Sequence, residues 1–284
     1  MQKYILPFLS VFLFIGQTVP VWSQETPQRP DIVFISKPRP NTTSLLDRNL
    51  PPPEVQIIQE FIEQRMPPQD LTTRALRLDK TETTDAELRI IAYVYPNLVE
   101  LTLSETQITD AGLAPLKKLT KLRKIRISKT AITDNAAKVL AQIPTLEDID
   151  VSQTSFGDEG LKALQPLEKL KRLNLYTTKI TDQGLVALKD FKSQKTLTWL
   201  NVDRCTLTDA AIPLLSPLEN LEWLHLGWTR LTDAGLEKLA GLKTLKEVHI
   251  TNTGVTLDGV KKFKSALPEC KVNENVEETQ NVAP

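Results

Sequence analysis

The sequence predicts a right-handed α/β solenoid, with a parallel sheet on its concave face and short helices on its convex face. Three observations lead to this class of fold. A unit with the pattern LxxLxLxxTxITDxGLxxLxxL recurs along most of the chain. Successive units are 24 residues apart, except for one interval of 27. Each unit joins an alternating apolar stretch, typical of a half-buried strand, to apolar residues at helical spacing, and a period in this range is typical of solenoids.

The N-terminal 23 residues have the pattern of a signal peptide. Lys3 precedes an apolar run over 4–15, and Val21 and Ser23 satisfy the small-residue rule for cleavage after Ser23. The apolar run is shorter than the roughly 20 residues of a spanning helix, although an uncleaved anchor remains an alternative. We therefore expect an exported protein, either secreted or in the periplasm or cell envelope, with no integral membrane segment after cleavage.

Residues 24–70 differ in composition from the rest of the chain. This segment holds nine of the 19 prolines, which favours extended and weakly packed chain. Within it, Val55, Ile58, Phe61 and Ile62 fall on one helical face, so we predict a helix over 54–66. A helix directly before a repeat array would cover the first apolar edge of that array.

The repeat domain is expected over 71–272, with one degenerate unit, seven full units and a C-terminal cap near 267–272. The position of Gly112 marks the period, and its equivalents are Ala136, Gly160, Gly184, Ala211, Gly235 and Gly259. The three residues added in the one longer unit fall around 190–195 and lengthen a loop. The polar residues 273–284 are predicted to be a disordered tail.

Each part of the unit has a predicted structural role. The alternating residues form a short strand, followed by a corner closed by a small polar residue, which is threonine in most units. Ile-Thr-Asp then begins a short helix, with Thr or Asp available to cap it, and the following Gly or Ala permits close backbone packing. Pro115 and Pro213 lie inside helical segments, so those helices must be short or distorted.

This pattern resembles the leucine-rich repeat, in the variety found in ribonuclease-inhibitor-like arrays and in bacterial exported proteins. The resemblance covers about 200 of the 284 residues. It implies a binding module, because leucine-rich repeat proteins mostly present the concave sheet to another macromolecule.

The two cysteines are predicted to be free and buried. Cys205 occupies the small polar corner position of the fifth full unit, whereas Cys270 aligns with the strand of the terminal cap. Three strand steps of a parallel sheet span roughly 14 Å, well beyond the ~7 Å that a disulfide can bridge.

The residues that point outward from the strands divide the predicted sheet into two halves. The N-terminal half carries charges that alternate in sign from strand to strand, and Arg126 faces Asp150 beside them, which favours cross-strand ion pairs. The alternating residues are Glu100, Lys124, Asp148 and Arg172. The C-terminal half carries aromatic and imidazole side chains in adjacent strands, the residue types that binding sites use for large contact area. The predicted partner-binding residues are Tyr176, Trp199, Asp203, Trp223, His225 and His249.

We expect these residues to bind a protein partner, so the predicted function is that of an exported, non-enzymatic protein-binding scaffold. Two other partners stay open: a carbohydrate on the same tryptophans, or a second copy of the chain. The tryptophans could instead simply stack on each other or be covered. Zero net charge argues against nucleic acid. The histidines and Asp203 lack an evident further ligand, and no nucleophile lies beside a base, so we predict no metal, no cofactor and no enzymatic activity.

Overall fold

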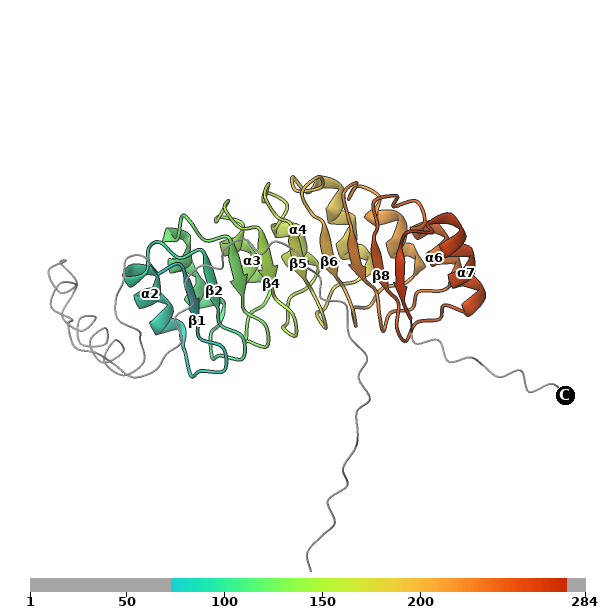
Figure 1. The fold of residues 1–284 in the computed structure, drawn as a ribbon. Coiled ribbons are helices and arrows are strands. Elements are labelled where there is room, and N and C mark those ends of the chain that lie inside the picture. Colours follow the sequence, from blue (N-terminus) through green and yellow to red (C-terminus); the bar gives the residue numbers. More distant parts are fainter. Residues whose placement is uncertain (1–72, 275–284) are drawn as a thin grey trace, which may run out of the picture.

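The computed structural model describes residues 73–274, which form one elongated, curved stack of repeats (Figure 1). Nine short strands make a single sheet in the order β1 to β9, and every neighbouring pair is parallel. The strands are β1 (Ala75–Arg77), β2 (Glu100–Thr102), β3 (Lys124–Arg126), β4 (Asp148–Asp150), β5 (Arg172–Asn174), β6 (Trp199–Asn201), β7 (Trp223–His225), β8 (Glu247–His249) and β9 (Lys271–Asn273). The predicted α/β solenoid is confirmed.

One helical segment or more follows each of the first eight strands. These segments are α2 (Asp85–Val94), η1 (Asp110–Lys118), α3 (Asp134–Leu140), α4 (Asp158–Ala163), α5 (Asp182–Leu185), η2 (Val186–Asp190), η3 (Asp209–Leu215), α6 (Asp233–Leu239) and α7 (Leu257–Ala266). Pro115 and Pro213 lie in η1 and η3, which are 3₁₀ helices. A proline has no N–H to donate and its ring clashes with the preceding turn of an α-helix, so the predicted distortion is confirmed.

A single apolar core runs the length of the stack. The middle residue of each strand points into it, and Leu101, Ile125, Ile149 and Leu173 are paired in register and fully buried. The first and third residues of each strand point to the opposite side, which we call the open face of the sheet. Each repeat buries its apolar residues against its neighbours, so the stack shares one core.

An aspartate at the start of most helical segments ties its repeat to the next. Asp158, the first residue of α4, accepts hydrogen bonds from the backbone N–H of Thr181 at 2.8 Å and from its hydroxyl at 2.6 Å. The same pair of bonds recurs at Asp85, Asp110, Asp182, Asp209 and Asp233. Thr181 also caps its own helix by accepting from Gln183 N–H. The threonine is therefore the predicted cap, while the aspartate links adjacent repeats, a role that we did not predict.

This aspartate ladder explains the small residue of the repeat. A Cβ atom added to Gly184 would collide with the carboxylate of Asp158 in the preceding repeat. The close packing predicted at this position is therefore an approach of backbone to a side-chain carboxylate.

The corner after each strand is closed by a side chain that bonds to the backbone. In most repeats the threonine hydroxyl donates to the carbonyl three residues earlier, as Thr229 does to Leu226 at 2.6 Å. Cys205 takes this position in its own repeat, and its thiol donates to the carbonyl of Leu175 at 3.2 Å. Cys205 and Cys270 are both free and buried, as predicted.

The two thiols are expected to be unreactive in the native protein. Burial raises the pKa of Cys205, and burial followed by the charge of Glu247 raises the pKa of Cys270 to about 11, so both stay protonated near neutral pH. An aromatic disulfide reagent should label neither thiol in native buffer within minutes and both thiols in urea. Rapid labelling of either cysteine in the native protein would contradict this packing.

Some of the predicted domain limits lie outside the described residues. The signal segment 1–23, the proline-rich segment 24–70 and the helix over 54–66 belong to this part of the chain. At the other end, Asn273 was predicted to begin the disordered tail, but it is the last residue of β9. Its amide bonds to residues of β8, which a polar composition does not indicate. No helix in residues 73–274 is long and apolar enough to span a bilayer.

Candidate functional site

The candidate site lies on the open face of β6, β7 and β8. The register pairs Trp199 with Trp223, and His225 with His249. These four side chains are partly buried, and we call them the aromatic patch. They sit next to one another because each is the first or third residue of a three-residue strand, and a fixed register repeats those positions on each neighbouring strand.

The two indole rings stack face to face. Their centroids are 4.3 Å apart and their planes differ by 7°. The guanidinium of Arg172 lies 4.2 Å above the outer face of Trp199, and the ring of His249 lies 4.8 Å from Trp223. Arg172 and the two indoles are therefore layered, and the His249 ring packs against Trp223 with its plane tilted by 48°. These contacts hold the indoles in one orientation.

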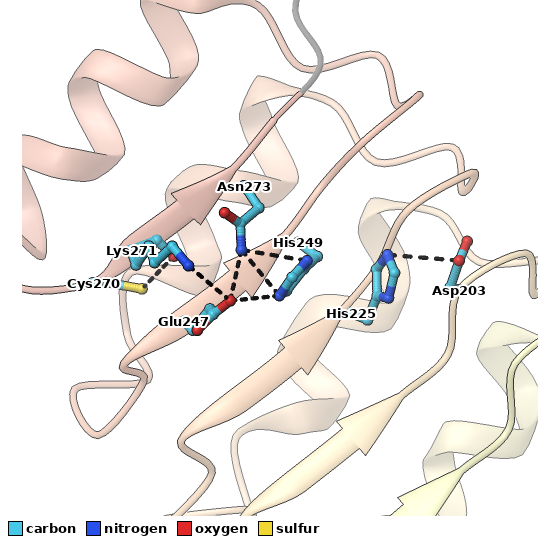
Figure 2. A network of polar contacts seen from close by, with 7 residues as sticks. All are labelled: Asp203, His225, Glu247, His249, Cys270, Lys271 and Asn273. Atoms are coloured by element: carbon cyan, nitrogen blue, oxygen red, sulfur yellow. Dashed lines mark hydrogen bonds and ion pairs between the residues drawn. The ribbon is translucent and has the colours of Figure 1, made fainter. Parts of the chain in front are cut away.

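The imidazoles are held by the polar contacts drawn in Figure 2. His249 Nε2 lies 2.8 Å from Glu247 Oε1, and Asn273 Nδ2 lies 2.6 Å from the same carboxylate oxygen and 3.0 Å from His249 Nε2. Lys271 Nζ is a further 3.5 Å neighbour of Glu247. The His225 ring lies 4.8 Å from that of His249. The last strand of the array therefore fixes one side of the patch.

Asp203 lies beside His225, at a distance that would allow an ion pair with a protonated imidazole (dashed in Figure 2). The distance from Asp203 Oδ2 to His225 Nε2 is 3.6 Å, which is longer than a hydrogen bond. Within residues 73–274, neither Asp203 Oδ1 nor His225 Nε2 has a hydrogen-bond partner, although both atoms are buried. Burial raises the pKa of Asp203.

The pKa of His225 gives a direct check of this environment. Burial, and then the nearby His249, lowers it from 6.5 to about 4. Because protonation then favours the unfolded chain, stability contributed by His225 should fall as the pH drops from about 6.5 to about 4. In an NMR titration, the His225 ring protons should shift near pH 4, with His249→Gln used to assign the two histidines. A midpoint near 6.5 would show that His225 is solvated.

The structure brings together five of the six predicted site residues. Tyr176 is the exception, because its side chain has no ring contact or hydrogen bond with the other five among the described residues. Sequence reasoning missed three neighbours of the patch. Arg172 had been grouped with the charged half, Asn273 with the tail, and Glu247 had no predicted role. For Arg172, the sequence indicated its place in the patch only by its position in the repeat, which puts it opposite Trp199 on the neighbouring strand.

The charged half of the open face follows the predicted pattern in part. Lys124 pairs with Glu100 at 3.3 Å and Arg172 with Asp148 at 3.5 Å. Arg126 lies in register with Asp150, but that carboxylate accepts from the backbone and hydroxyl of Ser152. The Asp150 carboxylate is therefore hydrogen-bonded within its own repeat and does not depend on an ion pair with Arg126.

Trp228 lies at the corner beyond the patch and has a left-handed backbone. Its φ is 52°, it is 50% exposed, and Arg204 lies 4.1 Å from its ring centroid. Every repeat places a residue with positive φ at this corner, and none of them is glycine.

A pair of variants isolates the strain at this corner. Trp228→Gly should be more stable than Trp228→Ala by about 1 kcal/mol, because both lack the ring and only alanine retains a Cβ. At Lys238 in α6, the same pair should show the opposite order, since helix propensity favours alanine. Thermal unfolding measures both differences, and a Trp228→Ala variant at least as stable as Trp228→Gly would rule out the left-handed conformation.

No group of three or more His, Cys, Asp or Glu side chains within 73–274 could hold a metal ion. The site is therefore described by aromatic contact surface and by the buried carboxylate of Asp203.

Comparisons with known proteins agree with this fold. The family model described as "Leucine Rich repeat" matches residues 96–117, 142–164 and 218–240. Internalin C2 from Listeria monocytogenes has a similar structure, with a TM-score of 0.53 and 24% sequence identity over 78% of this chain and 92% of that chain. A search of curated proteins finds no match. The three matched segments and the likeness to internalin C2 support leucine-rich repeats in the described part of the chain.

Proposed function

We propose that this chain is an exported, non-enzymatic scaffold that binds a protein partner through the aromatic patch. The observation that carries the proposal is the stack of Trp199 and Trp223, which is fixed at both ends by Arg172 and His249. Tryptophan and tyrosine dominate binding hot spots because they bury large area. Rings already held in one orientation lose little conformational entropy when a partner binds.

The same stack disfavours the carbohydrate alternative. A sugar ring binds a tryptophan by lying against a free indole face. Here Arg172 covers one face of Trp199, the two indoles cover each other, and His249 lies against Trp223. The patch therefore offers ring edges, which suit the mixed apolar and polar surface of a protein.

Affinity capture from an extracellular extract, followed by mass spectrometry, tests the proposal. The wild type should enrich a partner that the Trp199→Ala/Trp223→Ala variant loses. A matched control, Lys124→Ala/Arg126→Ala, changes two open-face residues of the charged half and should retain the partner. Retention by the tryptophan variant would contradict the proposal. Light scattering of the wild type at several concentrations identifies the outcome in which the partner is a second copy.

Export rests on the N-terminal pattern alone. The mature protein recovered outside the cytoplasm should begin at Gln24, which intact-mass measurement can establish. Recovery of the full-length chain in the cytoplasm would contradict this part of the proposal.

A further inference from the structure

Asp203 is a buried carboxylate that the chain itself leaves incompletely bonded. The residue is 7% exposed, and its Oδ1 accepts no hydrogen bond within residues 73–274. Burying an ionised group is costly unless it is paired and hydrogen-bonded. An explanation is needed for why a carboxylate occupies this position.

Asp79 provides an internal comparison, because it holds the same position in the first repeat. Its Oδ2 accepts from the hydroxyl of Thr102 at 2.6 Å and its Oδ1 from the backbone N–H of Ser104 at 2.7 Å, both in the next repeat. The corresponding neighbours of Asp203 are His225 and Gly227. His225 lies 3.6 Å away, beyond hydrogen-bond distance, and within residues 73–274 the backbone N–H of Gly227 donates no hydrogen bond to Asp203 Oδ1. The fold can therefore satisfy this aspartate, but the repeat that follows Asp203 does not.

The nearby cations are engaged elsewhere. Arg204 lies over the ring of Trp228, and Arg172 lies over Trp199 and pairs with Asp148. Within the described part of the chain, Asp203 forms no ion pair with a lysine or an arginine. His225 is neutral near pH 7 because burial lowers its pKa. Burial raises the pKa of Asp203 and outweighs the charges of Arg204 and His249, which lower it. Direct contact between a cation and the Asp203 carboxylate is thus left for a group outside the chain.

The surroundings fit a cation better than a neutral donor. Thr177 N–H donates to the carbonyl of Asp203, which places the backbone of Tyr176 beside Asp203 without a hydrogen bond between their side chains, and His225 lies on the other side. Aromatic rings attract ammonium and guanidinium groups, and a carboxylate adds a charge-assisted hydrogen bond. The Asp203 side chain is 10% exposed, and its χ2 torsion is broad and two-fold, so rotation can bring either oxygen to the open face.

We propose that Asp203 receives a lysine or arginine side chain of the protein partner, at the edge of the aromatic patch. The proposal rests on the proposed function and makes it specific, because it assigns a basic residue to the partner segment that contacts β6 and β7. The tryptophan stack would supply contact area, whereas Asp203 would select the charge.

The probe is N-acetylarginine amide, and its neutral isostere N-acetylcitrulline amide is the ligand control. The mature chain is labelled with ¹⁵N at the indoles of Trp199, Trp223 and Trp228, and single substitutions assign the signals. At low salt the arginine probe should shift the signals of Trp199 and Trp223 saturably. The citrulline probe should bind at least about tenfold more weakly than the arginine probe, because it cannot form a charge-assisted hydrogen bond.

Two isosteric variants complete the test. Asp203→Asn should weaken binding of the arginine probe about tenfold or more, whereas Asp79→Asn should leave it unchanged. Thermal unfolding establishes that both variants are folded. Equal binding of the two probes, unchanged binding by Asp203→Asn, or no saturable shift would each overturn the proposal.

Failure of this proposal can be separated from failure of the proposed function. A captured partner that binds Asp203→Asn as well as wild type, but is lost by the double tryptophan variant, would reject the cation contact and keep the scaffold. A partner that the double tryptophan variant retains would reject the scaffold proposal itself.

Discussion

Replacing Asp158 by alanine is expected to lower the free energy of unfolding by about 2–3 kcal/mol, whereas Asp258→Ala should change it by less than about 0.5 kcal/mol. Asp158 accepts two hydrogen bonds from Thr181, and charge-assisted bonds of this kind are among the stronger ones. Asp258 is the second residue of α7, whereas Asp158 is the first residue of α4. No further helix-bearing repeat follows α7, and Asp258 bonds only to the exposed Lys261.

The comparison is matched in charge and in the helical turn that carries the aspartate. Both aspartates lie in the first turn of a helix and interact favourably with its dipole, so that contribution cancels. Urea unfolding followed by circular dichroism measures both variants. Because repeat stability depends on neighbour interfaces, Asp158→Ala should also broaden the transition. Equal losses at the two positions would show that the aspartates act through their own helices and not through the next repeat.

The second large effect is expected on partner affinity. Each of Trp199→Ala and Trp223→Ala should weaken binding of the captured partner about 30-fold, the size typical of a hot-spot residue. The double variant should lose less than the product of the two single losses, because each ring holds the other at 4.3 Å. Isothermal titration of the four proteins completes the cycle.

A control variant addresses simple unfolding as the cause of lost affinity. Trp228→Ala removes an indole from the same part of the chain but outside the stack, and it should weaken binding far less. If the affinity loss of the double tryptophan variant equalled the product of the two single losses, the two rings would act independently. That result would contradict a rigid stack that acts as one contact surface.

The sequence was sufficient to predict which residues share the open face. Strands of a parallel sheet that recur every 24 residues must align equivalent positions, so Trp199 pairs with Trp223 and His225 with His249 as expected. Alternation within three residues then decides which side chains are buried, since a shift by one residue would expose the leucines. These two constraints leave little freedom in the fold.

The contacts of long or polar side chains could not be predicted in the same way. Arg172 has a carboxylate and an indole as neighbours in the register, and only its rotamer brings it over Trp199 while it also pairs with Asp148. The aspartates of the ladder resemble ordinary capping residues in the sequence. Their partners lie about one repeat away, which a local motif does not reveal. Asn273 was assigned to the tail because the composition after it is polar. Its hydrogen bonds to β8 depend on tertiary contact, which composition does not indicate.

The central claim is that the aromatic patch is the contact surface, and hydroxyl-radical footprinting of the complex tests it most directly. Oxidation of Trp199 and Trp223 should fall several-fold when the captured partner is bound, since both rings become covered. Oxidation of residues on the helical side, such as Lys138 of α3, should stay unchanged. Unchanged oxidation of both tryptophans, with protection on the helical side instead, would contradict the account.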